Sequence, residues 1–221
     1  MSRTRAVLVD LYDTLVWSDW PKLRALIEER TGLSTRALLG AFDHTRPARS
    51  VGTFANTQED LGAVLRSAGL EPSVELLDNL AGLVVATLAN GVHLWEDSIP
   101  TLRELHRRGI GTAVVSNCDH STRPEVERLG LVEETDAVIL SFEVGAAKPM
   151  PEIYLAALEA VGARPADALF VDDQADYCDG AAALGIATAI VLREDASPGE
   201  GTSEPGGHRV IADLRSLLEL V

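Results

Sequence analysis

The segment from Val7 to Val16 has the sequence VLVDLYDTLV, and it is the most informative part of this chain for predicting the fold. Its first residues, together with Ala6, form a short apolar run that is typical of a strand buried on both faces of a parallel sheet. The run ends in a carboxylate, Asp10, and a second acid, Asp13, follows directly after Tyr12. One acid after a buried strand often caps the next helix, so its meaning depends on the rest of the chain.

The residues that follow Trp17 show helical spacing of apolar side chains as far as about Asn90, with no convincing strand. The apolar stripes are bounded by helix start and stop signals, such as Pro21 and Gly32 around the first stripe. Consecutive amphipathic helices of this kind predict a small helical bundle. The stripes contain Leu23, Leu26 and Ile27; Leu38, Leu39 and Phe42 after Ser34; Leu61, Val64 and Leu65 between Thr57 and Gly69; and Val74, Leu77, Leu80, Val84 and Leu88 between Ser73 and Gly91.

From Pro100 onward, helical and strand patterns alternate, which predicts a parallel, doubly wound sheet. We therefore predict an α/β core formed by residues 1–16 and 95–221, with a small helical cap, residues 17–94, inserted after the first strand. The segment EDASPGEGTSEPGGH from Glu194 predicts a surface loop, and VIADLRSLLELV predicts a final helix. The expected helices cover 101–108, about 124–129, 151–161 and about 180–184, and the later strands are IGTAVVS, AVILS, ALFVDD and TAIVLR.

Composition narrows the class of protein. The chain has 221 residues, of which 46% are hydrophobic, enough for a folded core. A net charge of −15 argues against nucleic acid or an anionic membrane as a partner, because both would repel it. No run approaches the ~18 apolar residues that span a bilayer, and the N-terminal run is too short for a secretory signal. Cys118 and Cys178 lack the spacing of a zinc site or disulfide framework, so we expect a cytoplasmic protein. We also expect a small-molecule substrate. The sequence leaves open whether the protein is a monomer or a homodimer.

Polar residues recur at the ends of the predicted core strands. In open α/β sheets, ligands bind outside the carboxyl ends of the strands, and a cap inserted there would cover the site. One such residue is weak evidence, but several clusters in this order form a specific pattern. The clusters are Asp10; Ser116 and Asn117; Lys148, at a helix start after the third strand; and Asp172 with Asp173.

This pattern resembles the haloacid dehalogenase-like hydrolase superfamily. The ordered family motifs correspond to DLYDTL, VVSN, AAKPMPEIY and FVDDQADYCDGAAALG. The resemblance covers the whole α/β core, and the helical insert lies where the smaller cap class of the family lies. The insert itself matches only in its position and helix count.

The resemblance implies a nucleophile and a metal centre. Asp10 matches the family nucleophile, a carboxylate that forms a covalent intermediate with an electrophile held against it. A Mg²⁺ ion, which takes hard oxygen ligands, is implied at the Asp10 carboxylate, the Tyr12 backbone carbonyl and Asp172. Asp173 is implied in the same metal centre, where it would hold a water.

The resemblance also implies substrate contacts. Ser116 and the backbone at Asn117 would donate hydrogen bonds to phosphate oxygens, with Thr14 also in the substrate-binding set, and Lys148 would neutralise the nucleophile and the transferring group. Of the 19 basic residues only Lys22 and Lys148 are lysines. A lysine kept in an arginine-rich chain indicates that a compact point charge is needed there.

Tyr12 departs from the phosphatase pattern. Family phosphatases carry an aspartate two residues after the nucleophile, as a general acid and base that contributes ~10² to 10⁴-fold. Tyrosine has an ordinary pKa of about 10, a poor match to this role, and Asp13 is expected to point elsewhere. Tyrosine here resembles the 2-haloacid dehalogenase branch, where the leaving halide needs no proton. That branch works without metal and has small hydroxyl residues in place of Asp172 and Asp173.

Three functions stay open. The first is a Mg²⁺-dependent phosphatase for a small phosphorylated metabolite, favoured because the two extra acids would raise the pKa of Asp10 unless a cation balanced them. The second is a 2-haloacid dehalogenase-like hydrolase of carbon–halogen bonds. The third is a binding or regulatory protein with weakened catalysis. No motif identifies the substrate, because residues of the cap set it.

The remaining polar residues are less informative. The stretch AFDHTRPARSVGTFAN is predicted to connect two cap helices, and it contains His44, Arg46, Arg49 and Asn56. A loop there would either overhang the site and contact substrate or simply be solvated. His120 follows the second motif, and two positions are open for it: it reaches the pocket or, as we expect, it lies on the surface.

Overall fold

A computed structural model describes residues 4–193 and 207–221 of the chain. Its centre is a six-stranded sheet in the order β5-β4-β1-β6-β7-β8, and every neighbouring pair of strands is parallel. The predicted doubly wound parallel sheet is therefore confirmed. The strands are β1 (Ala6–Val9), β4 (Gly111–Ser116), β5 (Ala137–Leu140), β6 (Ala168–Asp172), β7 (Ala187–Val191) and β8 (Arg209–Ile211).

The first strand lies at the middle of the sheet. In β1, Val9 is in register with Val114 of β4 on one side and with Val171 of β6 on the other. All residues of β1 are buried, as its uninterrupted apolar sequence predicts for a central parallel strand. Because the three strands are parallel, their carboxyl ends meet at one edge of the sheet.

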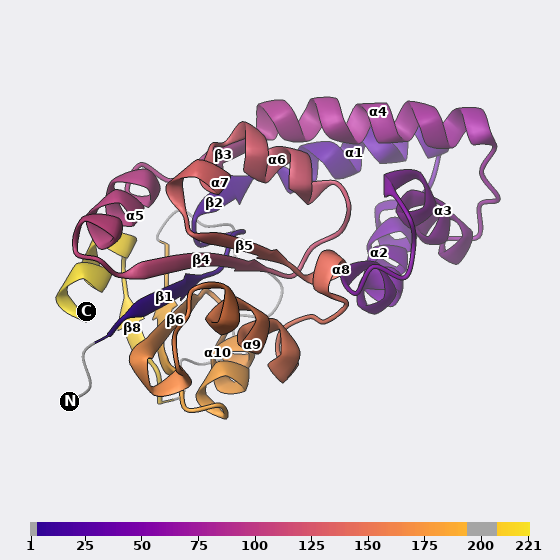
Figure 1. The fold of residues 1–221 in the computed structure, drawn as a ribbon. Helices are drawn as coiled ribbons and strands as arrows, with labels where there is room; N and C mark the ends of the chain where they lie inside the picture. The colour runs from indigo at the N-terminus through magenta and orange to yellow at the C-terminus, as the bar shows by residue number, and fades with distance from the viewer. Residues whose placement is uncertain (1–3, 194–206) are drawn as a thin grey trace.

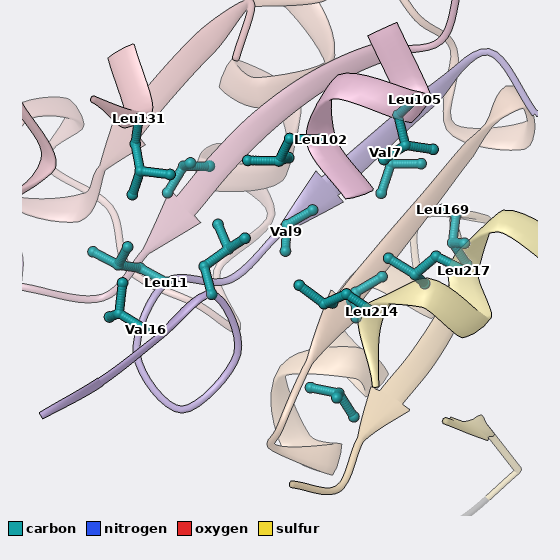
Figure 2. Packing of buried hydrophobic residues seen from close by; sticks show 14 of the residues in the cluster. Val7, Val9, Leu11, Val16, Leu102, Leu105, Leu131, Leu169, Leu214 and Leu217 are labelled. Carbon is teal, nitrogen blue, oxygen red and sulfur yellow. The ribbon is translucent and has the colours of Figure 1, made fainter. Parts of the chain in front are cut away.

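Helices cover both faces of the sheet, giving three layers (Figure 1). One face packs against α5, α7 and a C-terminal 3-10 helix, η2, through leucines such as Leu102, Leu105, Leu131 and Leu214 (Figure 2). The opposite face packs against α9 and α10. The bounds of the core helices are α5 (Ser98–Arg107), α6 (Thr122–Arg128), α7 (Leu131–Glu134), α8 (Ser141–Val144), α9 (Pro151–Ala160), η1 (Pro165–Asp167), α10 (Ala175–Ala182) and η2 (Leu214–Glu219).

The helical insert has its own hydrophobic core and lies to one side of the sheet (Figure 1). The four predicted helices are present, and hydroxyl side chains cap two of them, because Ser34 accepts from the N–H of Ala37 and Ser73 from that of Leu76. The third helix begins after Asn56 as its N-cap. The helices are α1 (Trp20–Thr31), α2 (Thr35–Ser50), α3 (Thr57–Ser67) and α4 (Val74–Gly91).

The prediction of a polar connection at AFDHTRPARSVGTFAN is wrong for most of its length, because α2 continues through Pro47 to Ser50. Proline removes one helical hydrogen bond, which is why the sequence suggested a break. Contacts further along the helix oppose that loss: the Arg49 guanidinium lies 5.1 Å from the centroid of the Phe42 ring of the same helix, and it pairs with Asp119 of the α/β core.

Two short pairings were not predicted. The strands β2 (Val16–Ser18) and β3 (Val92–Leu94) form an antiparallel ribbon where the chain leaves the core and returns to it. At the C-terminal end, the predicted single helix is instead β8 followed by the 3-10 helix η2. Most of the predicted loop at 194–208 lies outside the described residues. Within the described ranges, no helix combines the length and apolar content needed to cross a membrane.

A buried ion pair between Arg193 and Asp97 connects the segment after β7 with the start of α5 and the loop after β1. Arg193, just after β7, donates from Nη1 to the two carboxylate oxygens of Asp97 at 2.9 and 2.8 Å. Its Nη2 donates to the carbonyl of Thr14 at 2.6 Å. Asp97 also accepts from the N–H of Leu214 at 2.7 Å. Both side chains are nearly solvent-free, at 6% and 1% exposed, so each depends on the other for its charge.

Replacing Arg193 with methionine is expected to lower the free energy of unfolding by about 3–5 kcal/mol, because Asp97 then stays buried without a counter-charge. Urea denaturation followed by circular dichroism measures this change. Arg46→Met is the control: Arg46 pairs with Asp43 but is 62% exposed, so a change under about 1 kcal/mol is expected. Equal losses in the two variants would contradict the importance of this buried pair.

Candidate active site

The fold brings the predicted strand-end residues to one edge of the sheet. Asp10 directly follows β1, and its N–H donates to the carbonyl of Val171 in β6 at 2.9 Å. Ser116 is the last residue of β4 and Asp172 the last of β6. Because β4 and β6 flank β1, three residues far apart in the sequence occupy neighbouring strand ends.

Lys148 joins the two acids at the centre of this site. Its Nζ forms an ion pair with Asp10 and donates to Asp172 Oδ2 at 2.7 Å. Its side chain is only 1% exposed. The second oxygen of Asp172 accepts from the N–H of Gln174 at 2.9 Å, which fixes the orientation of that carboxylate. Such charge-assisted contacts in a dry environment hold both carboxylates in one defined geometry.

The backbone around Lys148 is held in place by Asn117. The side chain of Asn117 accepts from the N–H of Lys148 at 2.7 Å and donates to its carbonyl at 2.8 Å. A close approach of α10 supports the same segment, since a Cβ on Gly180 would lie 2.7 Å from Cβ of Pro149. Asn117 was predicted to contribute its backbone to substrate binding, and the structure adds a side-chain role in positioning the lysine.

Burial and mutual repulsion alter the acidities of the site. Burial raises the pKa of Asp10 to about 7, against the attraction of Lys148 and with added repulsion from Asp172. Burial also raises the pKa of Asp173 to about 9, again with repulsion from the neighbouring acids. The pKa of Lys148 is raised, because the two carboxylates outweigh the opposing effect of burial. If all three carboxylates were ionised, they would carry more negative charge than one lysine can balance.

The acids have the geometry and chemistry of a divalent-metal site. One oxygen from each of Asp10, Asp172 and Asp173 lies within 4.8 Å of the others. Carboxylate oxygens are the hard ligands that Mg²⁺ prefers, and a cation here would relieve the repulsion that raises the pKa values. The residues present therefore fit the ion that the sequence predicted, with Asp173 close enough to belong to the cluster.

Three buried hydroxyl groups lack partners among the described residues: one is Thr101 Oγ1 of α5, and the other two belong to residues predicted for the site. Ser116 Oγ and Thr14 Oγ1 are both inaccessible to solvent and make no hydrogen bond there. Buried polar atoms in folded proteins are almost always paired, so an orphaned hydroxyl at a strand end is a candidate contact for a bound ligand. Both residues were predicted to bind substrate, which agrees with this feature.

The Tyr12 hydroxyl is engaged away from the acids. It lies 3.3 Å from the Thr122 hydroxyl at the start of α6, and the Tyr12 ring packs against the apolar core. Burial raises the pKa of this hydroxyl above its ordinary value. Tyr12 is therefore a weaker proton donor here than tyrosine in water, which strengthens the argument from the sequence.

Asp13 contributes more to the site than the sequence suggested. Its φ of 61° lies in the left-handed region, which aspartate tolerates better than most residues, and its N–H donates to the carbonyl of Val16 at 2.7 Å. Its charge is among those that raise the pKa of Asp173. Asp13 thus adds to the negative potential beside the acid cluster.

Contacts between cap and core use residues that the sequence did not single out as a group. Arg49 of α2 pairs with Asp119 at 2.5 Å, and Asp60 of α3 lies 2.8 Å from Nδ1 of His120. His120 also stacks on Phe142, with ring centroids 4.5 Å apart, so the expectation of a free surface histidine is wrong. No spacing rule pairs residues so distant in the chain. The only signal in the sequence was the polar stretch that contains Arg49, which was expected either to overhang the site or to be solvated.

The other polar residues of the cap have local roles. Arg46 pairs with Asp43 one helical turn away, and Asn56 caps α3 by accepting from the N–H of Glu59. His44 is exposed on α2. None of these three side chains therefore belongs to the cluster of acids at the sheet edge.

Comparisons with known proteins agree with this geometry. Over 220 residues the chain is 29% identical to phosphatase MT3486 of Mycobacterium tuberculosis (strain CDC 1551 / Oshkosh), covering 97% of this chain and 96% of that protein. It is 30% identical over 203 residues to glyceraldehyde 3-phosphate phosphatase of Methanopyrus kandleri, covering 86% and 84%.

Among solved structures, L-2-haloacid dehalogenase from Xanthobacter autotrophicus with chloropropionic acid covalently bound superposes with a TM-score of 0.69. The two share 23% identity, and the match covers 98% of each chain, so this likeness concerns the fold. The family model for haloacid dehalogenase-like hydrolases matches residues 4–185. The acid cluster, the buried lysine and the interrupted parallel sheet thus occur in a chain that belongs to the haloacid dehalogenase-like hydrolase family.

Proposed function

We propose that this hydrolase is a Mg²⁺-dependent phosphatase that acts on a small phosphorylated metabolite. The observation that carries the proposal is a cluster of three carboxylates whose geometry fits a divalent cation, two of them paired with one buried lysine. A phosphate ester would bring further negative charge to this place, which the cation and Lys148 together would balance. The phosphatases among the similar proteins support the same class of substrate.

Each residue of the site has a task in this reaction. Asp10 provides the attacking carboxylate oxygen, and Lys148 holds that carboxylate in place while its charge faces the transferring group. The orphaned hydroxyl of Ser116 donates to a phosphate oxygen, and the unpartnered hydroxyl of Thr14 is assigned a similar contact. Bound Mg²⁺ would supply positive charge to the phosphoryl oxygens. Asp172 and Asp173 would hold that ion.

Proton transfer to the leaving group is the weak point of the site. The Tyr12 hydroxyl contacts Thr122, and its raised pKa makes it a poor donor near neutral pH. Leaving groups that depart as stable anions are therefore preferred, and aryl phosphates are suitable test substrates. The same feature suits expulsion of a halide, which keeps 2-haloacid dehalogenation as the second candidate function.

Asp10→Asn is expected to reduce hydrolysis of para-nitrophenyl phosphate by at least about a thousand-fold, because the amide is not a nucleophile. Release of para-nitrophenolate measures the rate, and circular dichroism checks that the variant is folded. Turnover retained by a folded Asp10→Asn protein would refute the assignment of the nucleophile.

Removal of metal with EDTA should lower the rate of phosphate ester hydrolysis by at least about a hundred-fold, and added Mg²⁺ should restore it. The same preparation, with and without Mg²⁺, is assayed for halide release from 2-haloacids. Halide release that EDTA leaves unchanged, in a protein without phosphatase activity, would favour the dehalogenase. If neither reaction occurs, the binding or regulatory function gains support.

Tyr12→Asp should raise kcat for phosphate esters with poor leaving groups by about 10- to 100-fold, since it restores an acid and base with a suitable pKa. Tyr12→Phe is the matched control, because it removes only the hydrogen bond to Thr122. Steady-state kinetics on alkyl and aryl phosphates separates the two variants. A folded Tyr12→Asp protein with an unchanged or lower rate would contradict the role assigned to this position.

A further inference from the structure

The turn that follows Asp10 is held by residues from distant parts of the chain. Its Leu15 carbonyl accepts from the N–H of Trp95 at 3.1 Å and from the Ser98 hydroxyl at 2.7 Å. The carbonyl of Thr14, one residue earlier, accepts from Nη2 of Arg193 at 2.6 Å. The position of this turn, which carries the orphaned Thr14 hydroxyl, therefore depends on contacts from outside it.

The peptide group that joins Thr14 to Leu15 is held at both of its polar atoms. Its N–H donates to the carbonyl of Leu11 at 2.9 Å within the turn, and its C=O accepts from Arg193. Because a peptide group is planar, these two contacts together fix its orientation. Threonine is β-branched, so its side chain has few rotamers on a fixed backbone. The direction of the Thr14 hydroxyl therefore follows from the orientation of this peptide group.

The guanidinium of Arg193 is itself held rigidly. Its Nη1 is fixed by both carboxylate oxygens of Asp97, and its central carbon lies 5.0 Å from the centroid of the Trp95 ring. A guanidinium is planar, so fixing Nη1 also fixes the direction of Nη2. The buried ion pair thus provides a rigid support for the carbonyl of Thr14.

We propose that Arg193 is a positioning residue for the phosphatase reaction: it holds the Thr14 carbonyl and thereby directs the Thr14 hydroxyl toward a phosphate oxygen of the substrate. This inference rests on the proposed phosphatase function, in which Thr14 contacts the phosphate. Arg193 does not touch the substrate, and its effect on the reaction passes through Thr14. Loss of Arg193 should therefore weaken the same interaction as loss of the Thr14 hydroxyl.

A double-mutant cycle tests this dependence. Arg193→Met should lower kcat/KM for para-nitrophenyl phosphate by about 10- to 100-fold, as expected for loss of a hydrogen bond to a charged group. Rates are divided by the folded fraction from circular dichroism, which removes the effect of lower stability. In Thr14→Val protein, which already lacks the hydroxyl, Arg193→Met should lower kcat/KM by less than about 3-fold.

Ser116→Ala protein is the second background, because Ser116 belongs to β4 and has no part in the turn. There Arg193→Met should still cause the full loss of about 10- to 100-fold, since independent contacts contribute additively. An equal loss from Arg193→Met in wild-type, Thr14→Val and Ser116→Ala proteins would overturn the proposal.

Arg108→Met is the matched control variant. Arg108 also joins a carboxylate to a backbone carbonyl, because its Nε donates to Glu104 at 2.9 Å and its Nη1 to the carbonyl of Leu218 at 2.6 Å. It precedes β4, at the edge of the sheet opposite to the acid cluster. This variant should keep kcat/KM within about 2-fold of wild type. A loss as large as that in Arg193→Met would refute a specific role for Arg193.

If wild-type protein with Mg²⁺ does not hydrolyse para-nitrophenyl phosphate, the phosphatase proposal fails separately. Amide hydrogen exchange measured by NMR then tests the positioning of the turn alone. Arg193→Met should accelerate exchange at the amides of Leu15 and Val16 by at least about 10-fold relative to amides of β4, which report global unfolding. Arg108→Met should not do so. Unchanged relative exchange in Arg193→Met would reject the role of Arg193 in holding the turn.

Discussion

The ion pairs of Lys148 with Asp10 and Asp172 are buried and hold the centre of the sheet edge together. They join the ends of two central strands through a lysine from a separate segment of the chain. Burying these charges is unfavourable unless each is paired, so the surrounding fold must hold all three groups in register. Asn117 and the close packing at Gly180 serve this need by fixing the backbone on either side of the lysine.

The same arrangement explains why the site suits a cation. One lysine cannot balance three ionised carboxylates. Burial, with added repulsion between the acids, therefore raises the pKa of Asp10 and of Asp173. Lys148 therefore balances only part of the negative charge that the acid cluster at the sheet edge would carry when ionised. Tyr12 follows Asp10 by two residues in the chain, but its hydroxyl is directed toward Thr122.

The cap meets the core through charged pairs that are well shielded from solvent. Arg49 with Asp119 and Asp60 with His120 join two cap helices to the loop after β4, the strand that also presents Ser116. These contacts couple the position of the cap to the loop that follows the strand ending in Ser116. The cap is close to the acid cluster along the chain as well, because the insert begins only a few residues after Asp10.

The sequence by itself determined the parallel sheet, the four cap helices and the strand-end residues, because apolar periodicity and capping residues act over short distances. It could not determine that α2 continues through Pro47, that the C-terminal segment pairs as β8, or that His120 meets Asp60. Those outcomes depend on partners distant in the chain. Only the tertiary structure decided them, because long-range contacts outweigh local preferences wherever burial supplies the larger free energy.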